Sequence, residues 1–319
     1  MACDVPNISA LSLPQVVDLA LDQLPGCKTM EEFLAVVRQE LHRLCDNKTQ
    51  INLKSFIDSP FLERLMDWKD GTPKYQNFGM HGVGLANAAD SLAAIDAHVF
   101  RGALSPKRLV DGVRSNFEKD PELLHLLRYE SPKLGCDEPL ADHYLCYLTD
   151  IFAEDLEART NCLGGCWRPG TGSAMYYLRM PREIGASPDG RRAGEPLSAN
   201  YSVSLFARPE GPFSVLRSMT APDLKRICNG GPLTLEFHQS LFRHPDSCKK
   251  LGQFVKKFIE MGGHQLQLNA VNSETLKDAQ QHPEQYPQLI VRIWRWSAYF
   301  TELDRSFQDH VIARQEYSL

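Results

Sequence analysis

The sequence lacks any apolar run that approaches the roughly 18 residues needed to span a bilayer. It also lacks an excess of positive charge, because 35 Lys and Arg residues are set against 40 Asp and Glu residues and the net charge is -5. Such a balance gives no electrostatic support for nucleic-acid binding. The first residues, MACDVP, have neither the basic nor the apolar region of a secretory signal. We therefore expect a cytoplasmic protein with no membrane and no nucleic-acid partner.

Matched cysteine pairs are absent as well. The nine cysteines are odd in number and irregularly spaced, which argues against a disulfide scaffold. Cys162 and Cys166 are the closest pair, but a zinc site needs about four ligands and no second pair lies nearby in the sequence. We therefore expect reduced, partly buried thiols and no metal site.

The first half of the chain has the apolar spacing of helices. The pattern predicts helices over residues 11–24 and 85–95, and a mostly helical region over 106–152 with a break near 131–133. Thr29 and Glu32 have the spacing of a capping box, which predicts the start of another helix. Residues 68–84 are rich in turn-forming residues and are expected to lie outside regular structure.

The second half alternates between strand and helix patterns. Glycine and proline are dense over residues 163–212, which predicts loops, and the strongest turn signal lies at 187–196. Strands are expected at 233–237 and 265–271, and helices at 251–261 and 273–281. This alternation predicts an α/β fold with at least partly parallel strands, built as one continuous unit.

The most informative motif lies near the C-terminus. Residues 292–300 read RIWRWSAYF, followed by LD at 303–304, QD at 308–309 and IAR at 312–314. This segment resembles the glycyl radical enzyme signature R-V-x-G-Y-S-A, L-D, Q-D and I-I-A-R. In that family the Gly of the signature carries a stable backbone radical. In this chain Arg295 stands at that position.

Other blocks resemble the same family in the same order. Residues 75–95 resemble its Y-N-F-x-G-x-Q-G-V-G-x-A-N-x-x-D-S-L segment, and residues 185–197 (GASPDGRRAGEPL) resemble its G-A-T-P-D-G-R-x-x-G-x-P-L loop. Residues 267–271 and 279–286 are similar to Q-F-N-V-V and A-Q-x-x-P-E-x-Y. The resemblance, to the pyruvate formate-lyase and glycerol or diol dehydratase-like members, covers about residues 60 to 319.

The resemblance implies an α/β fold in the form of a truncated barrel, one half-barrel with surrounding helices. Residues 1–200 would be the C-terminal part of the pyruvate formate-lyase-like barrel domain, and residues 201–319 a glycine-radical-like domain continuous with it. The family encloses two opposed loops, one with the radical Gly and one with a Cys that becomes a thiyl radical. We expect this chain to hold only the C-terminal half of that architecture.

Two cysteines are candidates for the thiyl position. Cys136 lies in the sequence GCDEP, similar to the dehydratase motif G-C-V-E-P, but it follows the G-V-G-x-A-N block that this motif precedes in the family. Cys3 has the better position, just before the first helix pattern, although Val5 stands where an acidic residue often follows. The alternative for Cys3 is a surface thiol close to a chain terminus.

Arg295 opposes the chemistry that the resemblance implies. A glycyl radical persists because the peptide flattens around Cα, and a long, permanently charged side chain crowds that state. In an apolar barrel the guanidinium needs a carboxylate partner or an aromatic face such as Trp294 or Trp296; at the surface it needs neither. The segment 169–172 (PGTG) also lacks the aromatic residue of the family's P-G-L-Y.

Three functions stay open at this point. The first is a pseudoenzyme or interaction subunit, which pairs with a second copy, a full-length glycyl radical enzyme or an activating enzyme. The second is an active lyase or dehydratase subunit completed by a partner chain that supplies the missing half-barrel and the radical Gly. The third is a binder of anionic ligands through Asp189, Arg191 and Arg192, although adjacent arginines are more often a solvated turn. No bound cofactor is expected; the family is activated by a radical-SAM iron-sulfur enzyme.

Overall fold

A computed structural model of the chain describes residues 7–57, 76–162, 164–239, 241, 246–294, 296–314 and 316–317. Its first sheet consists of three parallel strands in the order β1-β2-β3, with the bounds β1 (Asn7–Ser12), β2 (Phe78–Val83) and β3 (Trp167–Gly170). Parallel strands need long crossover connections, and the described parts of both connections contain helices.

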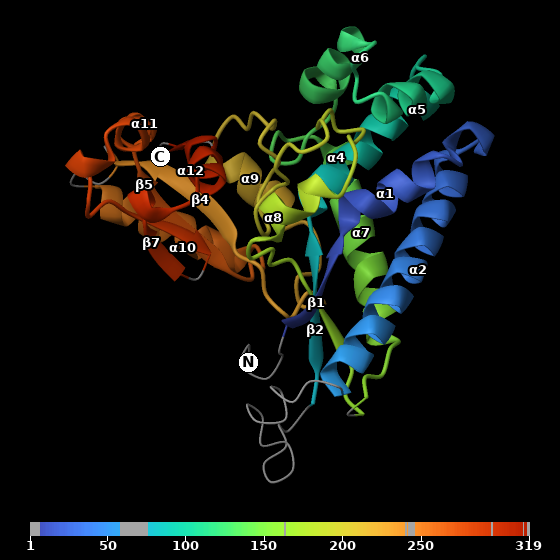
Figure 1. The fold of residues 1–319 in the computed structure, drawn as a ribbon, viewed down its shortest axis with the longest axis horizontal. Helices are drawn as coiled ribbons and strands as arrows, with labels where there is room; N and C mark the ends of the chain where they lie inside the picture. Colours follow the sequence, from blue (N-terminus) through green and yellow to red (C-terminus); the bar gives the residue numbers. More distant parts are fainter. Residues whose placement is uncertain are drawn as a thin grey trace.

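The helices of the first half are α1 (Leu13–Leu21), η2 (Leu24–Gly26), α2 (Met30–Ile57), α4 (Leu85–Ile95), η3 (Asp96–Phe100), α5 (Pro106–Arg114), α6 (Pro121–His125), η4 (Leu126–Glu130) and α7 (Pro139–Glu157). Helices α1, α2 and α7 lie on one side of β1 and β2, and the second sheet lies on the other side (Figure 1). No helix of the described ranges is both long and apolar enough to cross a membrane.

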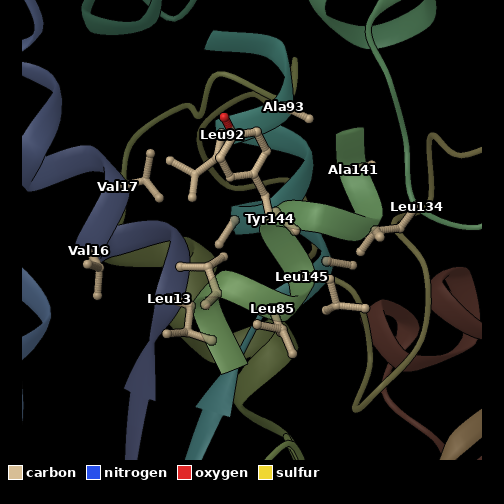
Figure 2. Packing of buried hydrophobic residues seen from close by; sticks show 14 of the residues in the cluster. Leu13, Val16, Val17, Leu85, Leu92, Ala93, Leu134, Ala141, Tyr144 and Leu145 are labelled. Atoms are coloured by element: carbon tan, nitrogen blue, oxygen red, sulfur yellow. The ribbon is translucent and has the colours of Figure 1, made fainter. Parts of the chain in front are cut away.

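The core of this half is the packing of α1, α4 and α7. Leu13 and Val16 from α1, Leu92 from α4 and Leu145 from α7 belong to one buried cluster and have no exposed surface (Figure 2). Burying each such side chain stabilises the fold by about 1.5–3 kcal/mol. Helix α4 is buried along its whole length, so it packs between its neighbours, as its apolar sequence indicated.

The first strand was not predicted from the sequence. The helix expected over 11–24 spans only Leu13–Leu21. It begins at Leu13 because Ser12 is the last residue of β1 and the N-cap of α1. The Ser12 hydroxyl accepts a hydrogen bond from the Gln15 amide at 3.3 Å. The apolar spacing of the helix extends into the strand, which is why the pattern alone placed the boundary too early.

The capping box predicted before α2 is confirmed. The Glu32 amide donates to the Thr29 hydroxyl at 3.3 Å, and the Glu32 carboxylate accepts from the Lys28 amide at 2.7 Å. The first bond satisfies an amide that the first turn of the helix leaves without an intrahelical partner, and the second binds the amide of the residue before Thr29.

The expectation of a turn-rich segment over 68–84 was wrong for residues 78–83, which form the fully buried strand β2. Residues 68–75 lie outside the described ranges. At position 79 the packing leaves no room for a side chain. A Cβ at this position would lie 2.2 Å from Nδ2 of Asn229 and 2.6 Å from Oδ1 of Asn7, so Gly79 allows these side chains to approach the backbone. Gly84 has the positive φ of 73° at the start of α4, so it does mark a change of chain direction.

The second half contains β4 (Leu233–His238), β5 (Leu266–Val271) and β8 (Glu316–Tyr317), which pair in parallel in the order β5-β4-β8. Its other elements are α8 (Tyr176–Arg179), η5 (Met180–Arg182), α9 (Pro212–Met219), α10 (Ser247–Glu260), α11 (Ser273–Gln281), η7 (Pro283–Gln285), the hairpin strands β6 (Ile290–Trp294) and β7 (Trp296–Tyr299), η8 (Phe300–Glu302) and α12 (Arg305–Ile312). The predicted α/β class, with parallel strands, is confirmed.

Backbone hydrogen bonds join the two sheets. The Asn229 amide donates to the Pro169 carbonyl at 3.0 Å, and the Thr171 amide donates to the Gly230 carbonyl at 2.7 Å. The segment that leads into β4 therefore runs along the free side of β3. The division of the chain at residues 200 and 201 stays a prediction.

Candidate functional site

The signature segment forms a two-stranded antiparallel hairpin, β6 and β7. Ile290 pairs with Tyr299 and Val291 with Ala298, and the register shifts between Arg292 and position 294. Arg295 stands between the two strands and lies outside the described residues, as does Cys3. The roles predicted for these two residues stay predictions.

One face of the hairpin is anchored and the other is exposed. Val291, Ile293 and Phe300 are buried in a small cluster with side chains of α11 and α12. On the outer face Ile290 is 58% and Trp296 40% exposed, well above the usual exposure of large apolar side chains. The strands that flank position 295 are therefore fixed to the domain on one side and exposed on the other.

Gln308 of the Q-D motif holds the end of this hairpin. Its side-chain amide is buried and donates to the Phe300 carbonyl at 2.9 Å and to the Leu303 carbonyl at 3.1 Å. These carbonyls belong to the first residue of the short helix η8, which follows β7, and to the residue directly after that helix. The residue therefore has a structural task that persists whether or not position 295 carries a radical.

A buried ion pair lies behind the hairpin. Nη1 of Arg314 donates to Oε1 of Glu236 at 2.7 Å, and the two side chains are 9% and 3% exposed. Asn269 on β5 donates to the same carboxylate oxygen at 2.9 Å. The pair links β4, β5 and the end of α12, and sequence reasoning missed it because 78 residues separate its members.

A cavity of about 50 Å³ adjoins this pair. Its polar lining includes Glu236, Arg314, His310, Thr234, Ser202 and Ser204, and Tyr317 lines it as well. His310 packs against Tyr177 with 4.4 Å between the ring centroids, and burial together with the Arg314 charge holds the pKa of His310 well below its usual range. His310 is therefore neutral, and the charges of Glu236 and Arg314 balance each other.

The loop at residues 185–196, predicted as a candidate anion site, is packed into the core at Asp189 and Arg191, both without exposed surface. Asn87 donates to Oδ2 of Asp189 at 2.7 Å, and Ser187 donates to its Oδ1 at 2.6 Å. The guanidinium of Arg191 donates to Ser187 Oγ and to carbonyl oxygens of the loop, including those of residues 185, 192 and 195. Arg192 is half-buried. Arg191 thus holds the loop itself, and anion binding there stays a prediction.

Asp90 lies beside this loop and was not singled out from the sequence. Its carboxylate accepts from the Leu134 amide and from the Ser204 hydroxyl, each at 2.8 Å. Burial raises the pKa of Asp90 to about 7, although Lys133 and the Leu134 amide oppose that rise. Only its place in the D-S-L block marks Asp90 in the sequence, and that block gives no indication of burial.

Within the described part of the chain, Cys136 and Cys166 have no feature of a reactive site. Cys136 is half-buried, and burial is the main cause that raises the pKa of its thiol, which keeps it protonated. The Cys166 thiol donates to Oδ1 of Asn77 at 3.2 Å. Among the residues that the structure describes, no three His, Cys, Asp or Glu side chains are grouped to hold a metal ion.

Two family models match the chain. Residues 28–178 match the model described as pyruvate formate lyase-like, and residues 202–301 match the model described as glycine radical. The second match contains the hairpin, the Glu236 strand and the lining segment at 202–207.

Known proteins agree with these matches. The chain is 30% identical over 294 residues to the probable dehydratase YbiW of Escherichia coli. The aligned stretch covers 88% of this chain and 36% of that protein. It is 27% identical to trans-4-hydroxy-L-proline dehydratase of Clostridioides difficile over 98% of this chain and 42% of that enzyme. The glycerol-bound B12-independent glycerol dehydratase from Clostridium butyricum superposes with a TM-score of 0.89 at 26% identity, covering 97% of this chain and 43% of that one.

The chain belongs to the glycyl radical enzyme family. Its fold is part of the barrel of that family, as the sequence predicted. It spans about two fifths of the length of the relatives that it matches.

Proposed function

We propose that this chain does not carry a glycyl radical and acts as a pseudoenzyme, an interaction subunit that retains the fold of a radical lyase or dehydratase. The observation that carries the proposal is Arg295, which stands where the family signature has Gly. A side chain at this position blocks the planar radical and replaces one of the two hydrogens of the Gly Cα.

The distribution of changes supports the proposal. Gln308 and Arg314 keep the residue types of the signature and have structural contacts, to the carbonyls of η8 and to Glu236. Residues at functional positions of the motifs differ, including Arg295 and the PGTG segment at 169–172. Selection that maintained the fold without the chemistry would leave this pattern.

The partner of such a subunit is expected to contact the exposed face of the hairpin. Ile290, Trp296 and Tyr299 are 58%, 40% and 43% exposed beside position 295. A second copy, a full-length relative and a radical-SAM activating enzyme are the three partners to test. Affinity purification from anaerobic cells, followed by light scattering of the complex, separates them by mass; a monomer without a partner contradicts the interaction role.

The matched relatives support a second function. A partner chain that supplies the other part of the barrel and a radical Gly would make this chain a subunit of an active lyase or dehydratase. The names of the matched relatives, which include several dehydratases, define the class of reaction to assay. Turnover that needs both chains, with the radical on the partner, would establish this function in place of the first.

The decisive experiment is anaerobic activation with a radical-SAM enzyme that activates a full-length relative, followed by electron paramagnetic resonance. The wild-type chain is expected to give no glycyl doublet, whereas the relative gives one in the same assay. The variant Arg295→Gly restores the residue of the signature, so a doublet in this variant alone identifies Arg295 as the cause of inactivity.

A further inference from the structure

The ion pair Glu236–Arg314 leaves hydrogen-bonding atoms unused in a buried place. Oε2 of Glu236, together with Nε and Nη2 of Arg314, has no hydrogen-bond partner of good geometry among the described residues. The buried hydroxyl of Thr234 also has no hydrogen-bond partner among the described residues. Buried polar atoms are nearly always paired in native proteins, so an unpaired group of this kind indicates an occupant.

The Nε and Nη2 atoms of Arg314 form the edge of the guanidinium that can donate two parallel hydrogen bonds to one ligand. Elsewhere in the chain Arg108 and Arg217 use their Nε and Nη2 atoms to hold both oxygens of Asp120 and Asp137. Arg314 instead contacts Glu236 through Nη1, and its Nε and Nη2 atoms have no partner of good geometry among the described residues, although the Tyr177 hydroxyl lies near enough for a weak interaction. The Tyr177 hydroxyl is its neighbour, since the charge of Arg314 lowers the pKa of that phenol against the effect of burial.

The charges that line the cavity limit the class of ligand that it can hold. The cavity already contains one carboxylate and one guanidinium, and the pKa of His310 is lowered so that its ring is neutral. An anion would satisfy Arg314 but would lie against Oε2 of Glu236, and a cation would repel Arg314. The balanced arrangement suits a neutral group that offers an acceptor and a donor side by side.

We propose that this cavity binds a small neutral molecule with a carboxamide group. The carbonyl oxygen accepts from Nε and Nη2 of Arg314, and the amide N–H donates to Oε2 of Glu236. Thr234 supplies a further hydroxyl, and Val203, Leu205 and Ala207 provide apolar contacts for a short alkyl group. This site depends on the second sheet and α12, and it is independent of any radical at position 295.

The volume limits the size of the ligand. A buried water needs roughly 10–15 Å³ of such space, so a cavity of about 50 Å³ has room for some three or four non-hydrogen atoms, or slightly more with side-chain adjustment. Acetamide and propionamide match this size. With so few atoms a dissociation constant of about 1 mM is expected, well within the ceiling for small ligands.

Ligand-observed NMR on the intact chain tests the proposal with four probes: propionamide, acetamide, acetate and ethanol. Saturable binding of propionamide, displaced by acetamide and by neither acetate nor ethanol at equal concentration, is the expected result. Preferential binding of acetate, equal binding of ethanol, or no binding of either amide at 20 times the expected constant, about 20 mM, would each overturn the assignment.

Three variants place the binding in this cavity. Thr234→Val removes the free hydroxyl and is expected to weaken propionamide binding about fivefold, the effect of one hydrogen bond. Thr220→Val is the matched control, since the Thr220 hydroxyl donates to the Leu216 carbonyl away from the cavity. Ala207→Leu fills the cavity and is expected to abolish binding; unchanged binding in a folded Ala207→Leu variant refutes the site.

Discussion

Removal of Glu236 is expected to destabilise the protein far more than removal of a surface carboxylate. Glu236→Leu leaves Arg314 charged and 9% exposed, with no other carboxylate among its hydrogen-bond partners in the described chain. Breaking a buried pair by deleting one partner costs about 3–5 kcal/mol, because the remaining charge stays desolvated. Asn269 also loses the acceptor that it reaches at 2.9 Å.

The assay is equilibrium unfolding in urea, with the free energy of unfolding measured for single and double variants. Glu236→Leu combined with Arg314→Met replaces both charges, so the double variant is expected to recover most of the loss. Asp111→Ala is the surface control, since the Lys107–Asp111 pair has exposures of 80% and 62% and is expected to contribute about 0.5 kcal/mol or less. Additive losses in the double variant, or a Glu236→Leu loss equal to the control, would refute the reasoning.

Three further predictions concern the buried framework. Stability is expected to fall as the pH rises from about 4 to about 7, because folding raises the pKa of Asp90 from 3.8 to about 7 and the folded chain keeps a proton that the unfolded chain releases. In urea unfolding, the free energy of Asp90→Asn should depend less on pH in this range. A pH dependence equal to that of the wild type would exclude Asp90 as the source. Gly79→Ala is expected to lower the free energy of unfolding by about 1–3 kcal/mol, because the added Cβ would collide with Asn229. Gly26→Ala is the control, since no atom lies within 4 Å of its added Cβ, and its free energy of unfolding should stay near that of the wild type. Equal melting temperatures of the two variants would contradict this expectation. Gln308→Leu removes two donors from buried carbonyls and should cost about 1–3 kcal/mol in the same urea assay, so a neutral result would show that the bonds to η8 contribute nothing.

Local signals were enough for several elements of the fold. The helices predicted over 85–95 and 273–281 have the bounds of α4 and α11, and in each case a cap residue precedes the helix: Gly84 with positive φ and Asn272, whose side chain accepts from two amides. Strand β2 was missed because its glycines read as turn residues. Gly79 accommodates Asn229, about 150 residues away, and Gly82 lies against Leu13 and Phe152, contacts that no local pattern contains.

The candidate site was less accessible to sequence reasoning. The hairpin segment was identified from its motif, because that motif is short and continuous. Asp189, Arg191 and Arg192 were interpreted as possible ligand contacts because adjacent arginines can hold an anion, with an exposed turn as the alternative. Asp189 is instead held by Asn87 and Ser91 of helix α4, and Arg191 by oxygen atoms of its own loop. The Glu236–Arg314 pair likewise required the parallel pairing of β4 and β8 to be known.

The central claim is that this member of the glycyl radical enzyme family keeps its fold without carrying the radical. Electron paramagnetic resonance after anaerobic activation tests it most directly, with protein labelled at glycine Cα with carbon-13 so that a signal can be assigned. We predict no glycyl signal from the wild-type chain and a carbon-13-broadened doublet from Arg295→Gly. A glycyl doublet from the wild-type chain, assigned to one of its own glycines, would contradict the account.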